Sequence, residues 1–293
     1  MIGKSKTNIQ HSICPICKKE IFVHLRKVKD DGYFERNNIA YCKRIFEIVR
    51  CSYCGMVFVK NPLNPTRYKE EEALDLVKTP VVLKSRHFFL LALLDWIVKK
   101  LRDRKPRILE IGCGFGQLYQ LANSKGYDYT AIEPFPIRAK ALEDSKLSVF
   151  KGTVQEFWQE RDNECFDIIV MDNVIEHIPF PLEIIEILEP LMASECYLIL
   201  AVPNLNDIRK YMLPGWGEAQ WMPVGHVNYF TPRTLGYLLE RTGLEIIYPF
   251  FITHEVGFGK QIAYLIKLFI EKYFRIYPFG LYRCTRRRTP TKN

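Results

Sequence analysis

Two kinds of hydrophobic spacing alternate along the middle of the chain. From Pro106 onward, short apolar runs are separated by segments in which apolar residues recur every three or four positions, as on one face of a helix. The runs predict strands at about 107–111, 128–132, 147–150, 166–171, 196–202 and 245–251, and the spaced segments predict helices at about 116–125, 136–144, 181–192 and 232–242. This alternation is typical of an α/β fold, a parallel sheet with helices on both faces.

The two ends of the chain follow other patterns. Residues 1–60 hold short apolar pieces around cysteine pairs and predict a small domain. Residues 61–104 form a connector, in which two prolines precede a long helical pattern that begins at about residue 66. We therefore expect an α/β core over 105–255 with a long loop at 203–230, and an amphipathic helix, an edge strand and a basic tail over 256–293.

The first predicted strand of the core ends in a glycine-rich turn. The segment RILEIGCGFGQ places Gly112, Gly114 and Gly116 where a strand becomes a helix. Glycine permits left-handed backbone angles and a close approach of the backbone to a ligand, because it has no side chain. The spacing departs from the dinucleotide-binding pattern G-x-G-x-x-G, since the third glycine comes one residue early. The turn predicts a ligand at the carboxyl ends of the strands.

A carboxylate at the end of the second core strand narrows the kind of ligand. Glu133, in the segment YTAIEP, stands where it can accept hydrogen bonds from two ribose hydroxyls. Together with FKGTVQEF after the third strand and the segment FDIIVMDNVIEHIPFPLEIIEILEPLMASECYLILAVPN, these features resemble class I S-adenosylmethionine-dependent methyltransferases over residues 105–250. The alternative is a Rossmann-like protein that binds another nucleotide or none.

The resemblance implies a fold, a cofactor and a set of contacts. The fold is a Rossmann-like, seven-stranded, mostly parallel sheet, and the cofactor is S-adenosylmethionine. The residues assigned to the cofactor follow the carboxyl ends of the first four core strands: Glu110, Gly112, Cys113, Gly114, Gly116, Glu133, Pro134, Thr153, Val154, Asp172 and Asn173. A non-catalytic, cofactor-binding scaffold is a further alternative, but it requires a defect in this set, and the sequence shows none.

Four of the nine cysteines form two Cys-x-x-Cys pairs, Cys14 with Cys17 and Cys51 with Cys54. No export signal precedes them, which favours a metal over disulfides. Two such pairs are a ligand set for one tetrahedral zinc ion in an amino-terminal zinc ribbon, and Gly55 suits the tight turn of the second pair. The alternative is a group of buried or redox-active thiols. The remaining cysteines are expected to pack in the core.

Two segments resemble a group of bacterial zinc-ribbon methyltransferases that act on sugars, surface-glycan precursors and natural products. They are CGMVFVKNP, which ends the ribbon, and GHVNYFTPRTLGYLLERTGLEI, which follows the long loop. The resemblance implies a small-molecule acceptor, a sugar, nucleotide sugar or lipid-linked glycan precursor. Trp216 and Trp221 in the loop either stack on that acceptor or anchor the loop itself.

Four residues are candidates for the chemistry. Methyl transfer to a hydroxyl needs a base, and His177 follows the fourth core strand, whose end is expected to face the methyl donor. Glu176 either assists His177 or lies exposed, and His226 and Tyr229 come from the loop expected to cap the acceptor. The alternative role of His177 is to order its loop through a backbone hydrogen bond.

The formal net charge of +9 is carried by the ends of the chain. Residues 1–60 hold 12 Lys and Arg against 5 Asp and Glu, and residues 260–293 hold 9 against 1, which leaves 21 against 27 between them. An acidic core disfavours nucleic acid as a partner, and an RNA methyltransferase that grips phosphates with its basic ends is the alternative.

The apolar face expected over residues 262–274 either packs on the core or touches a membrane surface within 260–288. With no apolar segment long enough to be a membrane span or an export signal, the expected location is the cytoplasm, with peripheral membrane contact as an addition. The sequence does not determine the oligomeric state.

Overall fold

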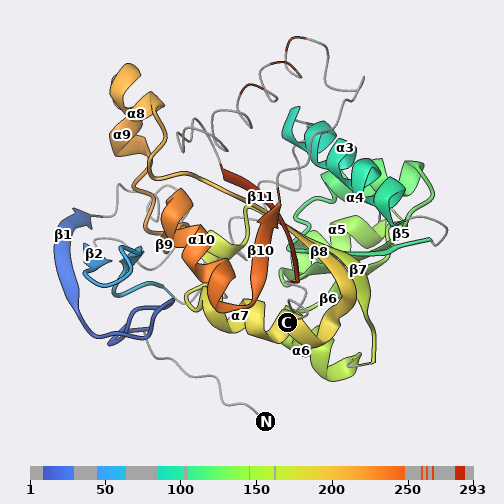
Figure 1. Cartoon of the computed structure of the whole chain (residues 1–293), viewed down its shortest axis with the longest axis horizontal. Helices are drawn as coiled ribbons and strands as arrows, with labels where there is room; N and C mark the ends of the chain where they lie inside the picture. Colours follow the sequence, from blue (N-terminus) through green and yellow to red (C-terminus); the bar gives the residue numbers. More distant parts are fainter. Residues whose placement is uncertain are drawn as a thin grey trace, which may run out of the picture.

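The computed structural model of the chain describes residues 9–29, 45–63, 83, 85–101, 105–144, 146–161, 163–247 and 281–287, together with residues 259, 262 and 266. Its larger sheet comprises β4 (Arg107–Ile111), β5 (Asp128–Glu133), β6 (Val149–Lys151), β7 (Phe166–Asp172), β8 (Met192–Val202), β10 (Leu244–Ile247) and β11 (Leu281–Arg287). These seven strands lie in the order β10-β11-β8-β7-β4-β5-β6 (Figure 1). Strands β4 to β8 pair in parallel and β11 is antiparallel to both neighbours, which confirms the expected sheet.

Helices cover both faces of this sheet, because successive side chains along a strand point to opposite faces. In β7, Ile168 and Val170 belong to the cluster under α3 (Ser85–Lys100), α4 (Gln117–Ser124) and α5 (Pro136–Asp144). Ile169 and Met171 point to the opposite face, where α6 (Val154–Glu160), α7 (Pro181–Leu188) and α10 (Pro232–Arg241) pack. Strands buried on both faces require continuous apolar runs, which is why the core strands were recognisable from the sequence.

The amino-terminal residues form a second, four-stranded antiparallel sheet. Its strands are β1 (Phe22–Lys29), β2 (Ile45–Cys51), β3 (Val57–Val59) and β9 (Asn228–Tyr229), in the order β1-β2-β3-β9. The last strand comes from the loop expected at 203–230, so this loop and the ribbon share a sheet. The same loop contains the short helices α8 (Arg209–Met212) and α9 (Trp216–Ala219).

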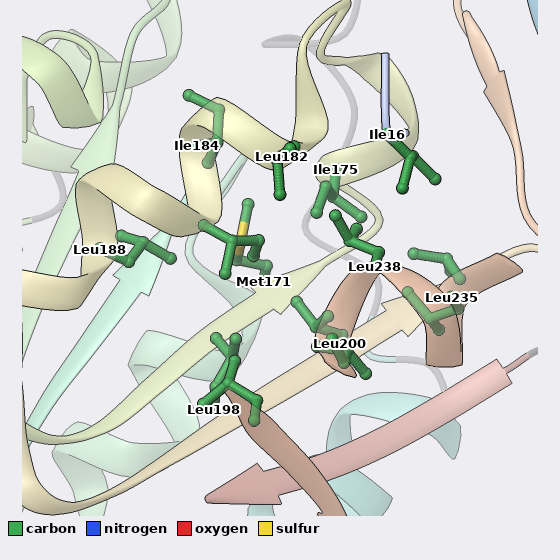
Figure 2. Packing of buried hydrophobic residues seen from close by; sticks show 14 of the residues in the cluster. Ile16, Met171, Ile175, Leu182, Ile184, Leu188, Leu198, Leu200, Leu235 and Leu238 are labelled. Atoms are coloured by element: carbon green, nitrogen blue, oxygen red, sulfur yellow. The ribbon is translucent and has the colours of Figure 1, made fainter. Parts of the chain in front are cut away.

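The ribbon also shares a hydrophobic core with the larger sheet. Ile16 is fully buried and lies near Leu182 of α7 and Ile175 (Figure 2). His11 packs edge-on against Phe180 at 5.0 Å between ring centroids. The predicted boundary at residue 60 is therefore a boundary in sequence and not between separately packed bodies.

Two expected elements of the fold need correction. The strand expected at the sheet edge, β11, lies between β10 and β8, so β10 is the edge strand. The helix expected over 181–192 ends at Leu188, because Pro190 lies in a 3₁₀ turn, η2 (Glu189–Leu191), before β8 begins.

The helix expected from residue 66, the apolar face over 262–274 and Cys42 fall mostly or wholly outside the described residues. Two described positions of that face, Ile262 and Ile266, are helical and exposed. Among the helices that the structure describes, none has the length and apolar character needed to cross a membrane.

Candidate active site

A cavity of about 750 Å³ opens at the carboxyl ends of the central strands, a volume typical of small-molecule sites. Chain order in the sheet reverses between β4 and β7, and ligands of open α/β sheets bind at such a switch point. We call the part lined by Gly112, Glu133 to Phe135 and Gly152 to Glu156 the glycine side. We call the part lined by Asn173, Val174, His177 to Phe180, Glu183, Ile184, Ile187 and Trp221 to His226 the histidine side.

The glycine turn has the backbone that its sequence predicts. Gly112, Gly114 and Gly116 have φ angles of 68°, 59° and 70°, in the left-handed region. A Cβ on Gly116 would lie 2.6 Å from Cδ2 of Leu142, so this glycine is required by packing between α4 and α5. A Cβ on Gly114 would meet nothing within 4 Å among the described atoms. Gly114 does not itself line the cavity, but its backbone N–H bonds to the carboxylate of Glu133, which does.

Glu133 ends β5 and its side chain is 1% exposed. One oxygen of its carboxylate accepts a hydrogen bond from the backbone N–H of Gly114 at 2.8 Å, and the other accepts one from Phe135 at 3.1 Å. These bonds hold the carboxylate at the cavity wall, where it also lines the glycine side together with Pro134.

Glu110 lies beneath the turn and outside the residues that line the cavity. Its carboxylate accepts a hydrogen bond from the hydroxyl of Tyr129 at 3.1 Å. Burial raises the pKa of Glu110 to about 8, the Tyr129 hydrogen bond opposes that shift, and the carboxylates of Asp172 and Glu133 add to it. The structure therefore places Glu110 as a buried residue of β4 that bonds to Tyr129 and does not line the cavity.

The other residues expected to bind the cofactor also fall into two groups, those that line the cavity and those that do not. Thr153 caps α6 through a reciprocal pair of bonds with Glu156, and both Thr153 and Val154 line the glycine side. Cys113 and Gly116 do not line the cavity, and Cys113 packs in the cluster under α4.

At the end of β7, Asn173 lines the cavity and Asp172 does not. Asn173 lines the cavity with a φ angle of 54°. Asp172 points away to accept a hydrogen bond from Nε of Arg86 at 3.1 Å, and so ties the start of α3 to the sheet.

Three titratable residues meet on the histidine side. His177 lies in η1 (Ile175–His177), and its Nδ1 is 2.8 Å from the carbonyl oxygen of Gly225. Its Nε2 is 3.9 Å from Oε1 of Glu176, and its ring lies edge-on to that of His226 with centroids 4.9 Å apart. Both histidines line the cavity, whereas Glu176 is 1% exposed and lies behind them.

Tyr229 is not brought to the cavity. It lies in β9, opposite Val57 of β3, and is 5% exposed within the ribbon's own hydrophobic cluster. Burial raises its pKa. Trp221 contacts the Tyr229 ring at 5.0 Å between centroids and also lines the cavity, while Trp216 stacks on Arg209 at 4.2 Å. Tyr229 and Trp216 thus contact only other parts of the protein. Trp221 both contacts Tyr229 and lines the cavity.

The ribbon cysteines converge as a possible ligand set. The four Sγ atoms of Cys14, Cys17, Cys51 and Cys54 lie within 4.8 Å of one another. The two nearest pairs are separated by 3.6 Å and 3.5 Å, far longer than the roughly 2.05 Å of a disulfide. Thiolates at about 2.3 Å from one tetrahedral ion are roughly 3.8 Å apart, so the spacing fits zinc.

The sequence did not reveal several residues that line the cavity. Ile9, Val28 and Lys29 come from the ribbon, and Phe135 and Arg138 follow β5. The guanidinium of Arg138 lies over the rings of Phe115 and Phe135 at 5.4 and 5.2 Å. Only Arg138 carried a usable signal, a cation five residues after Glu133 at the start of a helix. The ribbon contributions depend on packing between segments far apart in sequence.

Comparison with known proteins supports this arrangement. Residues 84–248 match the methyltransferase domain family. A ubiquinone biosynthesis O-methyltransferase of Actinobacillus pleuropneumoniae serotype 7 (strain AP76) is 30% identical over 130 residues, which are 41% of this chain and 55% of the relative. One of Vibrio cholerae serotype O1 (strain ATCC 39541) is 25% identical over 179 residues, 55% of this chain and 72% of the relative. The chain therefore spans little more than half the length of the Actinobacillus relative.

Solved structures share the fold. The plantazolicin methyltransferase BamL, in complex with a triazolic desmethylPZN analog and SAH, superposes with a TM-score of 0.54 at 17% identity, covering 77% of this chain and 92% of BamL. BpumL in complex with SAH gives 0.52 at 16% identity, with coverage of 77% and 91%. At this identity the likeness shows the fold alone.

A glycine turn at the switch point of a seven-stranded sheet, beside an acidic residue that ends the next strand, defines the class I methyltransferase arrangement. The family match covers more than half of the chain and begins at residue 84, so it includes α3 as well as the predicted core. The chain belongs to the methyltransferase domain family, as the resemblance implied.

Proposed function

We propose that this chain methylates a hydroxyl oxygen of a small molecule with an apolar body. The observation that carries the proposal is one cavity with two unlike sides. The glycine side holds the buried carboxylate of Glu133 and the backbone of Gly112, and the histidine side combines two imidazoles with largely apolar walls.

The glycine side suits S-adenosylmethionine. Gly112 brings the backbone of the turn to the cavity, and Glu133 stands at the cavity wall to accept ribose hydroxyls. Thr153 and Val154 line the part expected to hold the adenine ring, and Asn173 lies toward the histidine side. When bound, the cofactor supplies a methyl group on a positively charged sulfur. The chain's own residues orient it against the acceptor and exclude water.

The histidine side suits an apolar acceptor. Its walls include Ile178, Phe180, Ile184, Ile187 and Val224, and the ribbon adds Ile9 and Val28. A sugar would need several polar partners for its hydroxyls, whereas this wall offers few. Two relatives are named for O-methylation in ubiquinone biosynthesis, which also favours an acceptor oxygen. Deprotonation of that hydroxyl falls to the group formed by Glu176, His177 and His226.

The ribbon is proposed to bind one zinc ion through its four cysteines. The lysine and glycine that follow the two pairs, Lys18 and Gly55, have φ angles of 61° and 83°, so both turns fold back toward the sulfur atoms. The ion would fix the loops that carry Ile16 and, further along, Val28 and Lys29 at the cavity. The ribbon is thus proposed to shape the acceptor site as well as to support the fold.

The test is methyl transfer from isotope-labelled S-adenosylmethionine to three acceptor classes: alkyl-substituted phenols, nucleotide sugars and RNA. We expect label in the phenols, lost in Glu133→Ala and retained in the matched control His24→Ala, since His24 is exposed on β1. Label in nucleotide sugars would overturn the apolar acceptor and support the sugar acceptor implied by the sequence. Label in RNA would support the alternative in which the basic ends hold phosphates.

A further inference from the structure

A buried carboxylate and two imidazoles converge on the histidine side of the cavity. Glu176 and His177 lie in η1, and His226 comes from the loop that caps the cavity. One possible ligand atom from each residue lies within 4.8 Å of the other two. This group is distinct from the cysteine cluster of the ribbon, and two of its members face the cavity.

The orientation of His177 is set by its backbone contact. A carbonyl oxygen only accepts hydrogen bonds, so Nδ1 of His177 carries the proton that it shares with Gly225 at 2.8 Å. In the neutral ring the lone pair then belongs to Nε2, which is 3.9 Å from Oε1 of Glu176. Histidines that bind metals usually donate their other ring N–H to a carbonyl or carboxylate in this manner.

We propose that Glu176, His177 and His226 bind one divalent transition-metal ion. Two imidazoles and a carboxylate suit zinc, cobalt, iron or manganese, and they leave coordination positions open for a further ligand. Donors held at about 2.1 Å from one ion lie roughly 3 to 4 Å apart, so the observed spacing needs only small side-chain rotations. A cation also balances the charge of Glu176, a carboxylate buried away from solvent.

The ion has a defined task in the proposed reaction, on which this part of the inference rests. The open positions face the cavity through His177 and His226, so the acceptor hydroxyl binds there and its pKa falls. The hydroxyl proton passes to water, the oxygen forms the new bond to the methyl carbon, and the electron pair of the broken carbon–sulfur bond stays on sulfur. The alternative is direct proton removal by a histidine, which involves no ion.

Cobalt(II) is the probe that separates this site from the ribbon. Full-length protein whose cysteine site is filled with zinc is titrated with cobalt(II) and followed by visible absorption. We expect one further ion per chain, with the weak bands of nitrogen and oxygen ligands and without the intense charge-transfer band of cobalt thiolates. We expect His226→Ala to weaken cobalt binding at least tenfold, because one of three ligands is lost.

One control and a second ligand variant keep the test decisive. His24→Ala removes an exposed histidine elsewhere and is expected to bind cobalt as the wild type does. Glu176→Gln keeps the shape of the side chain and removes its charge, and it is expected to weaken binding as His226→Ala does. SAH affinity, measured on each variant, reports whether the cavity is folded.

Each outcome has one reading. Binding that is absent in folded wild type, unchanged in both ligand variants, or accompanied by thiolate bands overturns the metal site. If SAH still binds in that case, the proposed methyl transfer stands and direct proton removal replaces the ion. If wild-type protein binds cobalt but not SAH, the metal site stands and the proposed function fails.

Discussion

The buried carboxyl of Glu110 makes the stability of the fold depend on pH in a direction opposite to most acidic residues. Its folded-state pKa is about 8, above the ordinary value of 4.5, because burial disfavours the charged form. The folded chain therefore holds a proton that the unfolded chain releases. This contribution to stability is complete below about pH 4.5 and is lost as the pH rises through 8.

The magnitude follows from the difference between the two pKa values. Each pH unit between them changes the free energy of unfolding by about 1.4 kcal/mol, so the full effect approaches about 5 kcal/mol above pH 8. The substitution Glu110→Gln keeps the size of the side chain and an acceptor for the Tyr129 hydroxyl, but it cannot ionise. We expect the variant to be progressively more stable than the wild type as the pH rises.

The assay is urea unfolding of both proteins from about pH 5 to about pH 9, with zinc present. The quantity of interest is the difference in unfolding free energy between Glu110→Gln and wild type, because other titrating groups cancel in it. This difference should rise by about 1.4 kcal/mol per pH unit up to about pH 8 and then level off. A difference that does not change with pH would refute the reasoning, and it would indicate that Glu110 is hydrated in the folded protein.

The remaining predictions concern the turn and the ribbon. Gly116→Ala should lower the free energy of unfolding by about 2 to 4 kcal/mol, because its Cβ clashes with Leu142. Gly126→Ala, at a φ of 71° with open space around it, should lower it by about 1 kcal/mol. Equal losses of the two variants in urea unfolding would contradict this. Gly114→Ala should weaken SAH binding about tenfold by calorimetry, because alanine disfavours the left-handed φ of 59° and the N–H of this residue positions the Glu133 carboxylate. Its loss of stability should be no greater than that of Gly126→Ala. A strong zinc chelator should lower the melting temperature by roughly 5 to 15 °C, because Ile16 of the ribbon belongs to the shared core. Added zinc should restore it. An unchanged melting curve would show that the cysteines hold no structural ion.

Local pattern was sufficient for the core of the fold. The strand ending in Glu110, the helix over 136–144 and the left-handed glycines were predictable because each depends on the residues within a few positions. Glu133 was predictable as a cavity residue because the carboxyl ends of parallel strands meet at one edge of a sheet. The position of β11 was not, since pairing between β10 and β8 is decided by partners distant in sequence.

The candidate site was predictable only in part, for the same reason. Tyr229 was expected at the acceptor, but β9 pairs with β3 of the ribbon and directs it into another cluster. Glu110 was expected at the cofactor, and no sequence pattern distinguishes a carboxylate beside a cavity from one buried beneath a turn. Conversely, Val28 and Lys29 line the cavity because the ribbon packs against the core, a contact that no motif encodes.

The central claim is that the cavity beside the glycine turn binds the methyl donor through Glu133. Its most direct test is titration calorimetry of SAH with wild-type protein and with Glu133→Ala, each shown to be folded by circular dichroism. The account predicts one SAH per wild-type chain and an affinity reduced at least tenfold in the variant, because the buried carboxylate at the cavity wall is lost. Wild-type protein that binds no SAH, or a folded variant that binds it equally well, would contradict the claim.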